Sequence, residues 1–267
     1  MFLTKPERFL DAEIIKRVER IALVHGAENA VKARTYAIGD IHGMKDYLLN
    51  LLEFITETQK TDILYPSRFV FVGDYVDRGP EVSEVIAVIR LLQELMPEGD
   101  VVALMGNHEA MFIEELEVNG CVRYSKNTRD SFAKYGFRYK VPDDVIDWLK
   151  NLSYYYEDDK HYYVHAGFQP GVPIEKQDKE TMIWIREQFL HSKFNFGKRV
   201  IHGHTPRLNN IEQTEYRTNL DCGGCFGGSL MAAEIRSDRD YPVGFFLYKE
   251  GEKSYFKIGE DYRYSKQ

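Results

Sequence analysis

The sequence contains G-D-I-H-G at residues 39–43, G-D-Y-V-D-R-G at residues 73–79 and G-N-H-E at residues 106–109. Asp40 lies 34 residues before Asp74, which lies 33 residues before Asn107. This spacing is close to the roughly 30 residues of a strand, a crossover helix and a parallel strand. Because open α/β sheets bind ligands at the carboxyl ends of their strands, we expect these polar side chains to converge there.

Short apolar runs precede the three motifs and predict strands at residues 35–38, 68–72 and 101–105. Between them, apolar residues recur at helical spacing in residues 45–59 and 82–95. Two successive strand-helix-strand units predict parallel strands with right-handed crossovers. The first half of the chain is therefore predicted to be α/β.

The second half is richer in predicted strands, with one intervening helix around residues 181–190. The predicted strands cover residues 161–165, 199–202, 217–220, 229–235 and 242–249. A helix-rich half followed by a strand-rich half predicts two sheets packed face to face with helices outside.

The domain organisation is predicted from the same patterns. We expect an N-terminal amphipathic helical segment in residues 1–30, a catalytic domain in residues 31–255 and a C-terminal tail in residues 256–267. Residues 110–160 predict a helical insertion or cap. Within it, residues 123–140 interleave basic and aromatic side chains, which could form a rim for a phosphorylated substrate, although an exposed helical face is the preferred interpretation.

Composition excludes several classes of protein. The chain of 267 residues is 43% hydrophobic and 29% charged, with a formal net charge of −7, which argues against nucleic acid as a partner. No apolar stretch is long enough for a membrane span and no signal peptide is visible, so we expect a cytoplasmic protein without a membrane partner. Cys121, Cys222 and Cys225 are too few for a disulfide framework, and the C-x-x-C of the last two is more typical of a tight turn than of a metal site.

The residue types of the motifs predict a pair of divalent metal ions. Asp40 and His42 would hold the first ion, Asp74 would bridge, and Asn107 would bind the second. Two histidines that follow later predicted strands, His165 in V-H-A-G and His204 in H-G-H-T-P, would complete the second site. Ligands without thiolate favour manganese, with iron or zinc as alternatives. Any one of these motifs could be a helix cap or a turn, but five together at strand ends indicate a shared site.

G-D-I-H-G, G-D-Y-V-D-R-G, G-N-H-E, H-A-G and G-H-T-P resemble the motifs of the phosphoprotein phosphatase branch of the metallophosphoesterase superfamily. The resemblance covers about residues 35–229 and is greatest to the short bacterial and phage-type Ser/Thr protein phosphatases. It implies a calcineurin-like four-layer α/β/β/α sandwich of two mixed sheets. It also implies the ligand set given above for the two ions and leaves His202 outside that set.

Catalytic roles follow from physical chemistry and from the resemblance. A hydroxide that bridges two cations could attack phosphorus in line. His108 would protonate the leaving group, and Asp77 would orient its ring. Arg78 offers a planar fork for phosphate oxygens, Arg186 in W-I-R-E is a second candidate, and Arg207 is a weaker third.

The substrate is predicted to be a phosphorylated protein or a small phosphoester. A Ser/Thr protein phosphatase is the first hypothesis. The alternative is a symmetrical diadenosine tetraphosphatase, whose members typically lack the D-R of V-D-R-G and carry Asp where Glu109 stands. A regulatory module without activity would have lost some site residues, and none is missing. No regulatory subunit is implied.

Overall fold

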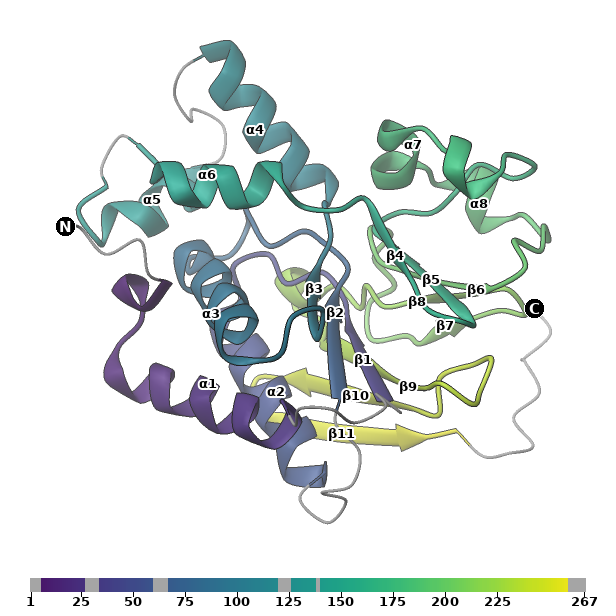
Figure 1. The fold of residues 1–267 in the computed structure, drawn as a ribbon, viewed down its shortest axis with the longest axis horizontal. Helices are drawn as coiled ribbons and strands as arrows, with labels where there is room; N and C mark the ends of the chain where they lie inside the picture. Colours follow the sequence, from purple (N-terminus) through teal and green to yellow (C-terminus); the bar gives the residue numbers. More distant parts are fainter. Residues whose placement is uncertain (1–5, 27–33, 60–66, 120–125, 138–139, 259–267) are drawn as a thin grey trace.

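The computed structural model describes residues 6–26, 34–59, 67–119, 126–137 and 140–258. Six strands form the first sheet in the order β11-β10-β9-β1-β2-β3 (Figure 1). Their bounds are Arg34–Ile38 for β1, Ser67–Phe71 for β2, Val101–Ala103 for β3, Leu230–Arg236 for β9, Gly244–Lys249 for β10 and Glu252–Lys257 for β11. The sheet is mixed, because β1, β2 and β3 are parallel and the other pairs are antiparallel.

The second sheet has five strands in the order β4-β5-β6-β8-β7. Their bounds are Tyr155–Glu157 for β4, His161–Val164 for β5, Arg199–His202 for β6, Glu212–Gln213 for β7 and Arg217–Asn219 for β8. This sheet is also mixed, with β5, β6 and β8 parallel and both edge strands antiparallel.

Side chains alternate between the two faces of the central strands, which explains why the two sheets pack together. On β1 and β2, Tyr36, Ile38, Phe69 and Phe71 lie in a core with three helices. These helices are α1 at Ala12–His25, α2 at Lys45–Gln59 and α3 at Val82–Leu95. Residues of opposite parity on the same strands, such as Ala37 and Val70, lie in a second core that the other sheet shares.

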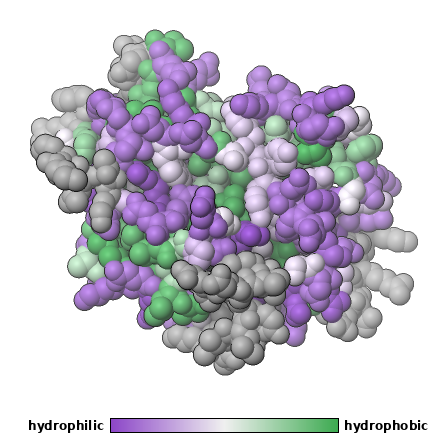
Figure 2. Space-filling model, viewed as in Figure 1, coloured by the Kyte–Doolittle hydropathy of each residue, from purple (hydrophilic) through white to green (hydrophobic). Residues whose placement is uncertain are grey.

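Two short helices cover the outer face of the second sheet. They are α7 at Lys179–Trp184 and α8 at Glu187–Leu190, and they pack on Val164 and Val200. Helices therefore lie outside both sheets (Figure 1), which confirms the predicted α/β/β/α sandwich. Hydrophilic residues predominate on the face shown in Figure 2. None of the helices in the described parts of the chain is long and apolar enough to cross a membrane.

In its described parts, the expected insertion contains strand β4 and three helices. The helices are α4 at Asn107–Asn119, α5 at Lys126–Ala133 and α6 at Asp143–Lys150. In the basic segment, Lys134 donates to the Pro80 carbonyl at 2.9 Å, and Lys140 pairs with Asp143 at 2.8 Å. Arg123 and Arg138 of that segment lie outside the described residues, as does Cys121.

Several elements differ from those predicted. The expected helix at 181–190 is divided into α7 and α8, because Ile185 and Arg186 adopt non-helical backbone angles. The short strands β4 and β7 and the hairpin strand β11 were not predicted, and β11 crosses the predicted domain boundary at residue 255. The N-terminal helix begins only at Ala12, where Asp11 caps it by accepting the Ile14 N–H at 2.9 Å, and a short 3₁₀ turn at Pro6–Phe9 precedes it.

Candidate dinuclear metal site

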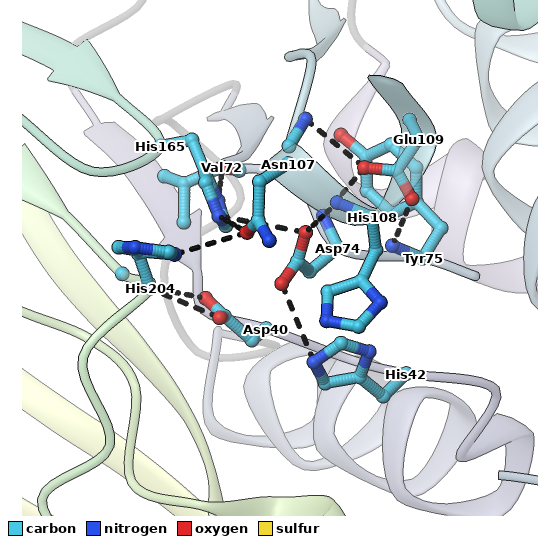
Figure 3. A network of polar contacts seen from close by, with 12 residues as sticks. Asp40, His42, Val72, Asp74, Tyr75, Asn107, His108, Glu109, His165 and His204 are labelled. Atoms are coloured by element: carbon cyan, nitrogen blue, oxygen red, sulfur yellow. Dashed lines mark hydrogen bonds and ion pairs between the residues drawn. The ribbon is translucent and has the colours of Figure 1, made fainter. Parts of the chain in front are cut away.

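The five motifs meet where strands of both sheets end. β1, β2 and β3 lead into their motifs from the first sheet, and β5 and β6 lead into theirs from the second. The side chains predicted as metal ligands face one another there (Figure 3). They are Asp40, His42, Asp74, Asn107, His165 and His204, and all six are buried.

Asp74 lies at the centre of the cluster. Its Oδ2 is 3.3 Å from His42 Nε2, and its Oδ1 is 3.4 Å from His165 Nε2. Among the described residues, two groups have ligand atoms within 4.8 Å of one another, His42 with Asp74 and His108, and Asp40 with Asp74 and His165. A carboxylate shared by two groups is what a bridged pair of cations requires.

The imidazoles of His42 and His165 are oriented as metal ligands usually are. Nδ1 of His42 is 2.8 Å from the Val76 carbonyl, and Nδ1 of His165 is 2.9 Å from the Val72 carbonyl. Each Nδ1 must carry a proton to donate to these oxygens, which leaves each Nε2 with a free lone pair directed at Asp74. Backbone acceptors of this kind fix the tautomer of metal-binding histidines.

His204 and Asn107 join the second side of the cluster. The Asn107 Oδ1 lies 2.9 Å from both His165 Nε2 and His204 Nδ1. The backbone N–H of His204 also donates to Asp40, with Oδ2 at 3.1 Å. The Nε2 of His204 is buried without a hydrogen-bond partner among the described residues. These donor atoms fit a divalent cation that prefers oxygen and nitrogen ligands.

An unexpected further carboxyl group, Asp221, adds to the acidity of the site. It is buried, and its Oδ1 accepts the Gly223 N–H at 2.9 Å. Burial and the nearby carboxylates raise the pKa of Asp40 well above its usual range and that of Asp221 to about 6. Burial also raises the pKa of Asp74, but the three surrounding histidines outweigh it and bring the value to about 2. Bound divalent cations would relieve this concentration of negative charge.

Unusual backbone conformations concentrate at the site. Five of the seven described non-glycine residues with positive φ belong to it, namely His42, Asp74, Asp77, Arg78 and His204. Such conformations cost about 1–3 kcal/mol each and persist where the surroundings enforce them. Glycines make room for the carboxylates, since a Cβ at Gly203 would lie 2.0 Å from Asp40 Oδ1 and one at Gly106 would lie 2.3 Å from Asp74 Oδ1.

His108 and Asp77 form the expected pair. The Nδ1 of His108 is 2.7 Å from Asp77 Oδ2. Burial lowers the pKa of His108, but the hydrogen bond to Asp77 and the charge of Asp74 outweigh it, so the pKa is raised. The ring stands edge-on to His42 with centroids 4.7 Å apart. This geometry holds a proton-carrying imidazole beside the cluster.

Helix α5 of the insertion holds Asp77 in place. Thr128 donates its hydroxyl to Asp77 Oδ1 at 2.9 Å and accepts the Asp77 N–H at 3.0 Å. Asn127 donates to the carbonyl of Arg78. Thr128 is fully buried. The sequence alone gave no indication of this contact, because Thr128 belongs to no motif.

Glu109, the last residue of G-N-H-E, accepts hydrogen bonds from the backbone. Its carboxylate accepts backbone N–H groups from Asp74, Tyr75 and Val76 at 2.8, 2.7 and 3.0 Å, and it is 0% exposed. Burial and the Asp74 carboxylate raise its pKa to about 7. Glu109 therefore shapes the loop that carries Asp74.

The predicted phosphate-binding arginines lie at two different places. Arg78 is exposed, with its Cζ 4.9 Å from the centroid of the Phe226 ring. Arg186 is exposed and donates to the Thr205 hydroxyl at 3.5 Å, beside His204. Arg207 instead pairs with Glu212 at 3.1 Å.

His202 and the C-x-x-C contact protein groups near the cluster. Both ring nitrogens of His202 face protein groups, the Gly203 carbonyl at 3.0 Å and Arg217 at 3.3 Å. In the C-x-x-C, the Cys222 thiol donates to the Asn210 carbonyl at 3.5 Å, and burial raises its pKa to about 12. A thiol with so high a pKa is a poor metal ligand.

Comparison with known proteins adds independent information. The sequence profile of the calcineurin-like phosphoesterase family matches residues 33–236. The symmetrical bis(5'-nucleosyl)-tetraphosphatase of Nitrosospira multiformis is 27% identical over 172 residues, which cover 64% of this chain and 56% of that protein. Serine/threonine-protein phosphatase 1 of Salmonella typhimurium is 25% identical over 212 residues, which cover 75% of this chain and 91% of that protein.

The solved structures agree with the fold. The crystal structure of a putative diadenosine tetraphosphatase matches with a TM-score of 0.59 at 22% identity, over 77% of this chain and 90% of that chain. At this identity the match shows similarity of fold alone.

The alignments to the first tetraphosphatases span about half of the length of those relatives, 56% and 52%.

Proposed function

Because the chain belongs to the calcineurin-like phosphoesterase family and is thus a phosphoester hydrolase, we propose that it hydrolyses dinucleoside polyphosphates. Two divalent cations, manganese in preference to iron or zinc, would bind to the cluster. Asp40, His42 and Asp74 would hold one ion, and Asp74, Asn107, His165 and His204 would hold the other. The position of Asp74 in both groups of donor atoms supports its role as the bridging ligand.

The remaining residues would handle the substrate. When bound, a pair of divalent cations acidifies water and neutralises phosphate oxygens. Arg78 and Arg186 would bind further phosphate oxygens, since both are exposed at the edge of the cluster. His108 would give its proton to the leaving oxygen, while Asp77 keeps the ring in one orientation.

The structure weakens the main sequence argument for a protein phosphatase. Glu109 favours that hypothesis, but its carboxylate accepts backbone N–H groups of the Asp74 loop and of Gly106. Asp77 is used by His108 and Thr128. Neither residue selects a substrate by contact. The named relatives at 27–30% identity support the tetraphosphatase alternative.

A Ser/Thr protein phosphatase remains the second candidate. The Salmonella typhimurium phosphatase matches over 91% of its own length, whereas the first tetraphosphatases match over about half of theirs. The exposed Arg78 next to the paired Asp77 and His108 is the local feature that favours this candidate.

A side-by-side assay separates the two candidates. Purified protein with Mn²⁺ is given diadenosine tetraphosphate, a phosphoserine peptide and an aryl phosphate, and kcat/KM is compared. We expect the dinucleotide to be preferred at least about tenfold, a difference of about 1.4 kcal/mol in transition-state stabilisation. We expect ADP as the product, which chromatography identifies. A preference for the phosphopeptide would reject the proposal in favour of the second candidate.

A further inference from the structure

Two large aromatic side chains are exposed at the edge of the candidate site. Phe226 is 49% exposed and Trp184 is 41% exposed, whereas Phe168 and Phe189, in the core against the second sheet, are buried. Exposed aromatic rings beside a polar site are typical of surfaces that stack on planar ligands.

Phe226 is presented by the Gly-rich loop, residues 221–229. Gly223 and Gly227 have φ values of 70° and 81°, on either side of the turn that carries Phe226. A Cβ at Gly228 would lie 2.0 Å from the Cys222 carbonyl oxygen, so the loop can close only with glycine there. At the start of the loop, Asp221 Oδ1 accepts the Gly223 N–H at 2.9 Å. The loop therefore fixes the Phe226 ring beside the Arg78 guanidinium.

Trp184 occupies the corresponding position near the second arginine. Its ring stands edge-on to His204, with centroids 5.8 Å apart and an interplanar angle of 89°. Arg186, two residues later, contacts Thr205, the residue that follows His204. Trp184 also lines a hollow of about 260 Å³ whose polar walls include Gln169, Thr181 and Gln188.

The two aromatic-arginine pairs lie near different ends of the cluster. Arg78 follows Asp77, whose partner His108 stands edge-on to His42. Arg186 donates to Thr205, the residue after His204. His42 and His204 lie on opposite sides of the cluster (Figure 3). Each end of the cluster thus has one arginine guanidinium group and one exposed aromatic ring.

We propose that Trp184 and Phe226 are stacking surfaces for the two nucleobases of a dinucleoside polyphosphate, an inference that rests on the proposed function. The phosphate chain lies across the cluster between Arg186 and Arg78. Gln169 and Gln188 line the hollow beside Trp184, and their amide groups would hydrogen-bond the edge of a base. A phosphorylated serine offers no ring to either surface.

Single variants test the two surfaces separately. We expect Trp184→Ala and Phe226→Ala each to raise KM for diadenosine tetraphosphate by about 5- to 100-fold, the usual worth of stacking on one base. The inhibition constant of inorganic tripolyphosphate, which has no base, should rise much less. Trp184→Phe and Phe226→Trp, which keep a ring, should recover most of the affinity for the dinucleotide.

Phe256→Ala is the matched control, because Phe256 is 53% exposed on β11 and belongs to no part of the site. Equal losses for the dinucleotide and tripolyphosphate would overturn the stacking role and mean that the rings only support the arginines. Unchanged KM in both alanine variants would overturn it as well, while leaving the proposed function intact. A wild-type protein that cleaves phosphopeptides but not the dinucleotide would reject both proposals.

Discussion

At the scale of single residues, His108 and Asp77 divide one task between them. Asp77 Oδ2 accepts a hydrogen bond from the His108 Nδ1–H at 2.7 Å. The proton available for a leaving group therefore lies on Nε2. The raised pKa of His108 favours the protonated ring. The need for this proton depends on the leaving group, because an alkoxide needs it far more than a nucleotide phosphate does.

Replacing His108 with Asn therefore has a substrate-dependent effect. We expect turnover of an alkyl phosphate to fall by about 10²- to 10⁴-fold, the usual contribution of a general acid. The loss on diadenosine tetraphosphate should be smaller, because its leaving group is already stable as an anion. Steady-state kinetics on both substrates, with metal content as control, measures this. An equal loss on both would reassign the proton donor.

At the scale of secondary structure elements, α5 supports the active loop from outside the motifs. Asp77 and Arg78 are consecutive residues with φ of 66°, and Thr128 and Asn127 hold them by hydrogen bonds. Ser131 on the same helix is 2.6 Å from Ser83 of α3, which fixes α5 to the first layer of helices. The insertion therefore positions the Asp77–His108 pair.

Thr128→Val removes this support while keeping the shape of the side chain. It leaves the Asp77 N–H buried without its acceptor and Oδ1 without its donor. We expect kcat to fall by about 10- to 100-fold, as for other residues that orient the groups of a site through hydrogen bonds. Thr128→Ser keeps the hydroxyl and should retain most of the activity. Similar kcat values for the two variants would show that the hydroxyl is dispensable.

The end of α1 gives the fold a pH dependence of its own. His25 is 1% exposed, and burial lowers its pKa from 6.5 to about 4. Thr56 donates to the Leu52 carbonyl, so it accepts from His25 Nε2 at 3.2 Å. Between these pKa values the unfolded chain binds more protons than the folded one, so stability falls as pH falls from 6.5 to about 4.

Chemical denaturation between pH 7 and 4 checks this effect. We expect protonation of His25 to cost up to about 3 kcal/mol at the lower end, from the size of its pKa shift. His25→Gln keeps a donor for Thr56 but cannot titrate, so its stability should depend less on pH. The expectation fails if both proteins lose the same stability over this range.

The sequence predicted those elements whose information is local. Short apolar runs predict β1, β2, β5 and β6, and the structure brings polar residues that follow them close together. The strands β4 and β7 have three and two residues and no distinct pattern, so only their partners define them. Thr128 lies 51 residues from Asp77, and Asp221 lies outside every motif. The place of neither residue at the site could be predicted without knowing how the layers pack.

At the scale of the whole molecule, the candidate metal site joins the two sheets. Asp40, Asp74 and Asn107 follow strands of the first sheet, and His165 and His204 follow strands of the second. Cations bound between them would link the two layers and offset the repulsion among the buried carboxylates. Metal binding should therefore stabilise the complete sandwich.

Thermal unfolding with and without Mn²⁺ measures this stabilisation. A ligand at 100 times its dissociation constant adds about 2.7 kcal/mol per site, which corresponds to a rise in Tm of roughly 5–10 °C for a protein of this size. Asp74→Asn removes the shared charge and should abolish most of this rise. A full rise in the Asp74→Asn protein would show that the metal binds elsewhere.

The contribution of both sheets to one cluster also bears on the order of events during synthesis. A nascent chain that has emerged only as far as β4 already contains Asp40, Asp74 and Asn107, but neither His165 nor His204. Such a fragment has the acidic half of the cluster and lacks the imidazoles of the later half. We expect hydrolytic competence to appear only after His204 has been added to the chain, so that shorter nascent chains cannot consume phosphoesters.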